Sequence, residues 1–343
     1  MSAGPSPLPA LPEPRGGLSA CVIEAIGDPD AELRPPPVLV GAPLDDDDLH
    51  LALYACYELH YHSFAGVADR WEWDPALLGF RAELECAFME GLRAAVPMRD
   101  DVEPDGIADL LFELAAEDDG PSVSSYLQTE GTIDQFREFV IHRSAYQLKE
   151  ADPHTWAIPR LRGAAKAAMV EIQADEYGSG RPDRVHSTLF AKAMDALGLD
   201  SAYGAYVDRI PGATLATVNL ISRFGLHREL RGALTGHLAM FEITSPVPNR
   251  RYAAALRRFG AADDAIDFFD EHVEADSVHE QVAARDLAQG LALAEPALAA
   301  QIVFGAEALL LLESRWGAAL LAGWEDGGSS LREARAGNAL SRA

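Results

Sequence analysis

Cysteine is scarce in this chain of 343 residues, and its distribution argues against two kinds of site. The three cysteines, Cys21, Cys56 and Cys86, are odd in number, lie far apart and form no C-x-x-C pair. Disulfide frameworks need paired cysteines in oxidising compartments, and thiolate metal sites use closely spaced ones. The sequence therefore predicts reduced thiols in a cytoplasmic protein.

Basic residues and long apolar runs are also few. The chain has 28 lysines and arginines against 54 acidic residues, which gives a formal net charge of −26. Such a surface repels phosphate backbones and anionic lipids, so we expect neither nucleic acid nor a membrane as a partner. No uninterrupted apolar run reaches the ~18 residues of a spanning helix, and no secretory signal is visible near Met1.

Alternating patterns of β-branched residues, which mark strands, are nearly absent from the chain. Apolar residues instead recur at helical spacing, in segments of about 10–25 residues joined by short connections. Asp74 followed by Pro75 is typical of a helix N-terminus. Thr132–Asp152 and Ala262–Leu293 are each expected to form one helix. The sequence thus predicts an all-α fold of neighbouring antiparallel helices.

Composition sets the two ends of the chain apart from the helical part between them. Residues 1–40 are dense in proline, including Pro35–Pro37, which disfavours helices and strands, and are expected to be a flexible leader. Residues 325–343 are expected to form a polar tail.

Two histidines and an aspartate share one face of the helix expected over Ala262–Leu293. His272, Asp276 and His279 are spaced i, i+4 and i+7, which places them within an arc of about 60°. Two imidazoles and a carboxylate that point in one direction suit a first-row transition metal. The alternative is a solvated acidic helix whose histidines align by chance, and ligands elsewhere in the chain decide between the two.

Glu176 and His186 form the best second group of candidate ligands. They stand on either side of the glycine-rich segment Gly178–Gly180, and a reversal of the chain there would bring the two side chains together. Glu242 lies within an apolar run, where an unpaired carboxylate is costly and calls for a partner or a metal.

The last candidate, Glu150, lies near the expected end of Thr132–Asp152, and Glu138 or Glu171 is an alternative to it. Two other pairs have the i, i+4 spacing of a metal site on one helix. These pairs are Glu58 with His62 and Glu138 with His142. Each is also what chance gives in a glutamate-rich helical protein.

The order Glu150, Glu176-x9-His186, Glu242, His272-x3-Asp276-x2-His279 resembles the heme-oxygenase-like diiron oxidases, an iron-containing redox enzyme family. The stretches Glu150–Pro153 and Glu171–Gly178 are similar to those around the first two acids in members that N-oxygenate amino-acid-derived substrates. The resemblance covers about 122–324 and implies a heme-oxygenase-like helical bundle. The helices of 41–121 resemble an accessory part that some relatives use in dimerisation.

The resemblance implies a site for two non-heme irons. Glu150, Glu176 and His186 would hold one iron, and His272, Asp276 and His279 the other, with Glu242 bridging or shared. Iron and manganese remain open as the native metal. The four carboxylates would offset two Fe(II) ions and leave the buried site roughly neutral.

The activity that the resemblance implies is oxidation of a small organic substrate with O2 as cosubstrate, by N-oxygenation or by oxidative C–C or C–H chemistry. It allows a homodimer and an external electron donor such as a reductase. One alternative is a heme-binding or heme-degrading protein with His142 as the proximal ligand. Another is a non-catalytic helical scaffold stabilised by metal. Three arginines are candidate anchors for a substrate carboxylate: Arg143, Arg160 and Arg223.

Overall fold

Every regular element in the described part of the chain is helical, which confirms the all-α prediction. The computed structural model describes residues 8–28, 31, 33–37 and 41–333, without the side chains of 274–277. The α-helices are α1 (Gly17–Gly27), α2 (Asp47–Glu58), α3 (Pro75–Ala95), α4 (Ile107–Glu117), α5 (Val123–Thr129), α6 (Ile133–Gln147), α7 (Asp152–Thr155), α8 (Gly163–Glu176), α9 (His186–Ala196), α10 (Gly212–Leu226), α11 (Arg231–Thr244), α12 (Pro246–Phe259), α13 (Asp263–Gln281), α14 (Gly290–Ala294) and α15 (Ala299–Glu325). Short 3₁₀ segments are η1 (Asp69–Trp73), η2 (Pro104–Gly106), η3 (Gly178–Gly180), η4 (Val207–Arg209), η5 (Arg228–Leu230) and η7 (Pro296–Leu298), and η6 (Val282–Gln289) is π-helical.

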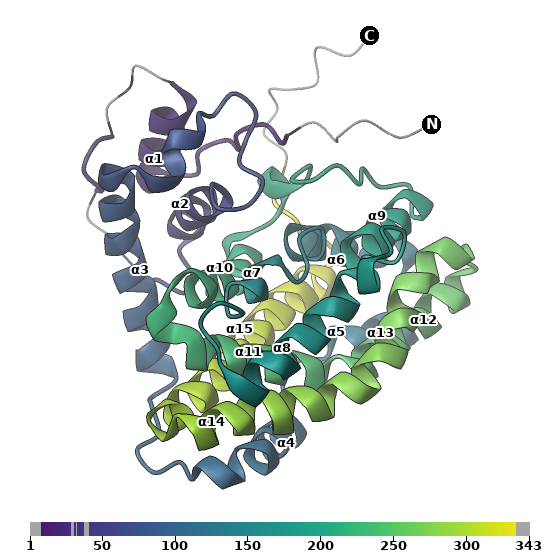
Figure 1. Cartoon of the computed structure of the whole chain (residues 1–343). Helices are drawn as coiled ribbons and strands as arrows, with labels where there is room; N and C mark the ends of the chain where they lie inside the picture. Colours follow the sequence, from purple (N-terminus) through teal and green to yellow (C-terminus); the bar gives the residue numbers. More distant parts are fainter. Residues whose placement is uncertain (1–7, 29–30, 32, 38–40, 334–343) are drawn as a thin grey trace.

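The helices α10, α11 and α15 form the centre of the molecule, with α1–α3 on one side of it (Figure 1). Helices α11 and α15 cross with their backbones almost in contact, because each contributes a glycine to the crossing. A Cβ on Gly236 would overlap the carbonyl of Ile302, and one on Gly305 would overlap that of Ala233. This close crossing fixes the helix that carries Glu242 against the core.

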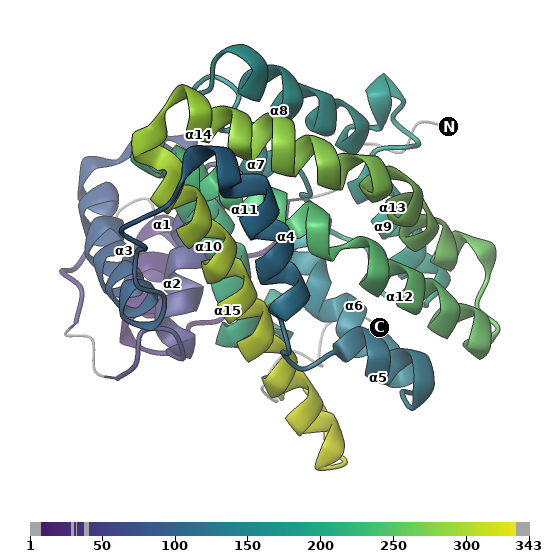
Figure 2. The same cartoon turned by 90° about the horizontal axis from the view of Figure 1, so that it is seen from below.

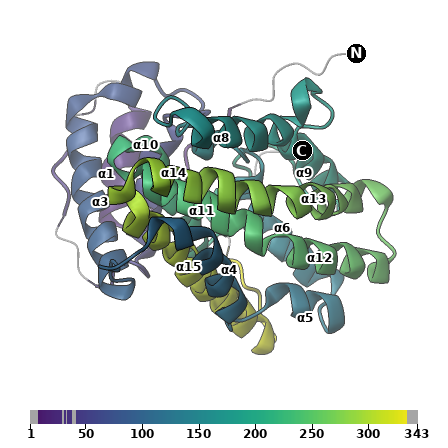
Figure 3. The same ribbon diagram turned by 60° about the horizontal axis from the view of Figure 1, so that its bottom comes forward.

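Helix α13, the π-helical segment η6 and α14 form one long rod, with α8 beside it (Figures 2 and 3). The segment expected to form a single helix, Ala262–Leu293, is thus helical almost throughout. It is not one α-helix, however, since a π-helical stretch separates α13 from α14. Such π-helical turns occur often at functional sites. Here the stretch directly follows the helix that carries His272 and His279.

The expectation that 1–40 forms no helix is wrong for α1. Helix α1 lies between Pro14 and Pro29, in a segment that itself contains no proline. Its first backbone N–H groups, those of Leu18 and Ser19, donate to Asp48 at 2.8 and 2.9 Å. The cap therefore comes from α2, and the prolines that flank α1 conceal it in the sequence.

The predicted helix N-terminus at Asp74 is confirmed, because its side chain accepts hydrogen bonds from the N–H groups of Ala76 and Leu77, with Pro75 at the first helical position.

The division of the chain at 121 remains a prediction. Helix α4, which lies in the expected accessory segment, packs against α11, α15 and η6 of the core (Figure 2). The described part of the expected tail also packs on the core, since Ser329 and Ser330 bond to Glu138.

One helix, Pro296–Glu325, is by length and composition apolar enough to cross a membrane, with a mean hydropathy of 1.5 over its most apolar window. Within this window, 56% is buried inside the protein. Because a central helix of a bundle passes the same test, this is weak evidence for a membrane span.

Candidate metal centre

Five segments bring the candidate ligands together in the interior. Glu150 lies in the turn after α6, Glu176 is the last residue of α8, and His186 is the first of α9. Glu242 comes from α11, and α13 supplies two histidines, His272 and His279. All six side chains are buried. The side chain of Asp276, the seventh candidate, lies outside the described residues, so its ligand role stays a prediction.

The six described side chains form two groups that share Glu176. In the first group, one donor atom from each of Glu150, Glu176, His186 and His272 lies within 4.8 Å of the others. In the second, Glu176, Glu242 and His279 are equally close. The resemblance implied a different partition, with His272 beside His279 and with Glu242 shared. The structure instead places His272 with Glu150, and Glu176 between the two groups.

The contact between Glu176 and His186 depends on the turn that joins α8 to α9. Gly178 there has φ of +65°, and a Cβ on it would lie 2.7 Å from the backbone of Arg184 and Val185. Only glycine fits this approach without a shift of the chain. The turn brings the Glu176 Oε2 atom to 2.9 Å from His186 Nδ1, as the spacing of the two residues around the glycine-rich segment predicted.

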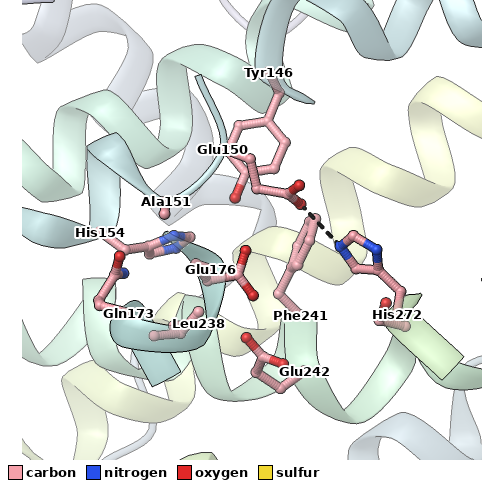
Figure 4. A pocket seen from close by; sticks show the side chains of 11 residues that line it. Tyr146, Glu150, Ala151, His154, Gln173, Glu176, Leu238, Phe241, Glu242 and His272 are labelled. Atoms are coloured by element: carbon pink, nitrogen blue, oxygen red, sulfur yellow. Dashed lines mark ion pairs between the residues drawn. The ribbon is translucent and has the colours of Figure 1, made fainter. Parts of the chain in front are cut away.

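Both histidines of α13 are oriented by a hydrogen bond on the side of the ring away from the candidate ligand group. His272 Nδ1 donates to the backbone carbonyl of Phe268 at 2.7 Å, while its Nε2 faces Glu150 at 3.5 Å (Figure 4). His279 Nε2 pairs with the Asp175 carboxylate at 3.1 Å, while its Nδ1 faces Glu242 at 3.6 Å. Metal-binding histidines characteristically hold the other ring nitrogen in this way.

The pKa of each carboxyl or imidazole in the site depends on burial and on the charged groups beside it. Burial raises the pKa of the Glu150 carboxyl, and His272 opposes that rise. Burial also opposes ionisation of Glu176, but His186 and the histidines of α13 hold its pKa below the usual range. Against the effect of burial, Glu242 and Asp175 raise the pKa of His279 to about 9. Without metal, the His279 imidazole therefore retains a proton that a bound cation would displace.

The candidate ligand atoms are arranged better for binding a metal ion than for hydrogen bonding to one another. Glu176 Oε2 and His186 Nδ1 lie 2.9 Å apart but do not form a hydrogen bond, and His279 Nδ1 likewise forms none with the described residues, although all three atoms are buried. Leaving buried polar atoms in this state is costly. A cation placed within each group would satisfy them. Mixed imidazole and carboxylate donors in a helical bundle are the set used by dimetal carboxylate proteins.

The other candidate acids and histidines have different roles. Glu138 accepts hydrogen bonds from Trp324 Nε1 and Ser330, and His142 contacts Thr214 at 2.6 Å and Ser330 at 3.1 Å through its two ring nitrogens. This arrangement does not favour His142 as a heme ligand. Glu58 forms a buried ion pair with Lys149, His62 packs against Tyr203, and Glu171 is exposed.

The three candidate arginine anchors are likewise engaged away from the ligands. Arg143 pairs with Glu313, and Arg160 donates to the backbone carbonyls of the last two residues of α10. Arg223 faces Glu85 and Glu229. Sequence reasoning missed Arg184, which pairs with Asp267 at 3.0 Å and also with Glu271. This contact ties the start of α9 to α13. Its only sequence signal is a basic residue shortly before His186.

A small cavity adjoins the carboxylates (Figure 4). Its volume is about 10 Å³, close to what one water molecule needs. The lining includes Tyr146, Leu238 and Phe241 beside the acids, and His154. His154 in turn contacts the buried His237 at 3.1 Å. The candidate metal site thus adjoins a small cavity that has apolar as well as acidic lining.

Comparison with known proteins agrees with this geometry. Residues 137–314, just over half of the chain, match the family described as iron-containing redox enzyme. The chain belongs to this family. The family match includes all the candidate ligands and confirms the resemblance stated from the sequence.

Within the iron-containing redox enzyme family, the nitrosourea synthase of Streptomyces achromogenes subsp. streptozoticus is 31% identical to the chain over 137 residues. These residues are 40% of the chain and 29% of that protein, so the match spans less than a third of its length. A crystal structure of a CADD-like protein of unknown function from Nostoc punctiforme aligns with a TM-score of 0.50 and 16% identity, over 62% of the chain and 95% of that protein. This second likeness concerns the fold alone.

Proposed function

We propose that the chain is a non-heme diiron oxidase or oxygenase that uses O2 to oxidise a small organic substrate. The observation that carries the proposal is the pair of buried ligand groups joined by Glu176. One iron would bind Glu150, Glu176, His186 and His272. The other would bind Glu176, Glu242 and His279, with Asp276 as a fourth ligand.

Bound iron would supply the electrons and the open coordination positions that O2 reduction requires. The residues of the chain contribute the orientation of the ligands, the balance of charge and the exclusion of water. The carbonyl of Phe268 and the carboxylate of Asp175 keep the ring nitrogens of His272 and His279 turned toward the ligand groups. The carboxylates offset the metal charge, which removes the cost of burying them unpaired. The apolar wall of Leu238 and Phe241 limits access of water.

For the substrate, the similarity to a protein named nitrosourea synthase supports N-oxygenation of a nitrogen-containing compound as the first reaction to test. Oxidative C–H and C–C chemistry are the other outcomes that we keep. An external electron donor, such as a reductase, would return the irons to the ferrous state. We also keep homodimerisation and a cytoplasmic location as proposals.

Exposure of the Fe(II)-loaded protein to O2 tests the proposal. Protein loaded anaerobically with two equivalents of Fe(II) is mixed with O2 in a stopped-flow spectrometer. We expect O2 consumption and a transient visible absorption band, both absent from Glu176→Gln. A wild-type protein that takes up iron but shows neither O2 consumption nor transient absorption would exclude an oxidase and favour a structural metal site.

A further inference from the structure

A buried ion pair connects α2 to the residue that precedes the candidate ligand Glu150. Lys149 Nζ lies 2.7 Å from Glu58 Oε2, and the two side chains are 1% and 0% exposed. The ammonium also lies over the ring of Tyr61, 4.2 Å from its centroid, and the hydroxyl of Tyr203 donates to the other oxygen of Glu58. A pair this deeply buried depends on exact partners, so it fixes the position of Lys149 firmly.

The residue after Glu150 has an unfavourable backbone conformation. Ala151 is 1% exposed and has φ of +75° and ψ of −33°. A residue with a Cβ rarely adopts positive φ, and such conformations persist only where neighbouring structure enforces them. The carbonyl of Ala151 accepts the backbone N–H groups of His154 and Thr155 at 3.1 and 3.0 Å, so it begins α7.

The chain on the far side of Ala151 is anchored to α8. The hydroxyl of Tyr177 donates to Asp152 at 2.7 Å and lies 2.9 Å from Thr155 Oγ1. Tyr177 directly follows Glu176. Asp152 and Tyr177, which follow the candidate ligands Glu150 and Glu176 closely in sequence, are therefore bonded to each other, while Lys149 is held by α2.

We infer that Lys149 and Ala151 are positioning residues, which together hold the Glu150 carboxylate toward His272 before metal binds. Helix α2 is then part of the metal centre through Glu58, although it supplies no ligand. The inference rests on the proposed iron site. The strain at Ala151 reduces the stability of the metal-free protein, and the contacts of Lys149 with Glu58 and of Asp152 with Tyr177 prevent the turn from relaxing away from the first ligand group.

Replacement of Ala151 by glycine separates this role from a purely structural one. Glycine adopts positive φ without strain, so the unfolding temperature of metal-free Ala151→Gly should rise by about 2 °C. The loss of the buried Cβ of Ala151, which lines the cavity beside Glu150, should at the same time loosen the packing around this carboxylate. Fe(II) binding by the Glu150 group should therefore weaken about tenfold, the size seen when ligand-orienting residues are removed. Binding by the group that contains Glu242 and His279 should change less than twofold. Stability and affinity then move in opposite directions.

Two further variants complete the experiment. Ser63→Gly is the matched control, because Ser63 also has positive φ (61°) and belongs to neither ligand group, and its N–H bonds to the backbone carbonyl of Glu58, which the change leaves in place. It should raise stability without a change in affinity. The paired change Glu58→Leu with Lys149→Met removes the ion pair without leaving a lone buried charge. The paired change should weaken Fe(II) binding by the Glu150 group about tenfold. If the paired variant does not fold, the result for Ala151→Gly tests the inference by itself.

Anaerobic Fe(II) titration against a competing chelator, with thermal unfolding of the metal-free proteins, gives both readouts. Two irons in the wild type and one weakened iron in Ala151→Gly support the inference. Two irons with unchanged affinities in Ala151→Gly overturn it and leave the proposed function intact. A wild-type protein that binds no iron overturns the proposed function and this inference with it.

Discussion

The Glu176 carboxylate lies 2.9 Å from the His186 imidazole, on the opposite side of a glycine turn. Glu176 also belongs to both candidate ligand groups. The turn Gly178–Gly180 therefore controls a contact on which the whole site depends.

Two glycines in this turn allow a matched comparison. Both have positive φ, but a Cβ on Gly178 would lie 2.7 Å from the backbone of Arg184, whereas nothing lies within 4 Å of one on Gly180. We expect Gly180→Ala to lower the free energy of unfolding by about 1 kcal/mol and Gly178→Ala by roughly 2–4 kcal/mol. Chemical denaturation measures both. Only Gly178→Ala should also weaken iron binding, and equal effects of the two changes would contradict this role of the close approach.

The crossing of α11 with α15 gives a second test, which concerns the fold rather than the site. Gly305 contacts the backbone of Ala233 so closely that a Cβ cannot fit, while Gly290 in α14 has only an ordinary contact at 3.8 Å. Gly305→Ala should destabilise the protein by about 3 kcal/mol or more, because the helices must separate. Gly290→Ala should stabilise it by about 0.5–1 kcal/mol through helix propensity. Thermal unfolding of the two variants distinguishes these outcomes, and a stable, fully folded Gly305→Ala would contradict the observed crossing.

Buried histidines outside the ligand set determine the response to acid. Burial lowers the pKa of His50 to about 4, of His142 to about 3 and of His154 to about 4. The ordinary value is about 6.5, so between roughly pH 6.5 and 4 the unfolded chain binds protons that the folded protein does not. Stability should therefore fall as the pH is lowered through this window, by about 1.4 kcal/mol per pH unit for each such histidine.

Urea unfolding of the metal-free protein at several pH values measures this slope. His142→Gln keeps a neutral polar side chain and should reduce the slope by about one proton. An unchanged slope in this variant would mean that His142 is charged in the folded protein or does not differ between the two states.

The helical class follows from local sequence, and so does part of the arrangement of the candidate ligands. Helical spacing alone places His272 and His279 on one face, and the glycines after Glu176 predict the return of the chain toward His186. The structure has the predicted contact between Glu176 and His186, and it places both histidines of α13 among candidate ligands, although in different groups. Local pattern suffices here because each relation involves one helix or one turn.

The features that sequence reasoning missed depend on contacts between distant segments. Helix α1 is capped by Asp48 of α2, which compensates for the flanking prolines. The grouping of His272 with Glu150 rather than with His279 depends on how α13 lies against α9 and the turn after α6. That turn was expected to be helical as far as Asp152, yet α6 ends at Gln147 and Ala151 has positive φ. No local propensity predicts a strained alanine.

The amount of Fe(II) that the protein binds tests the central claim most directly. Anaerobic titration followed by iron analysis should give two irons per wild-type chain. The count should fall to about one in Glu242→Gln, which alters only the second group, and below one in Glu176→Gln, which alters both. Saturation of the wild type at one iron or none, or retention of two irons by Glu176→Gln, would contradict a diiron centre that shares Glu176.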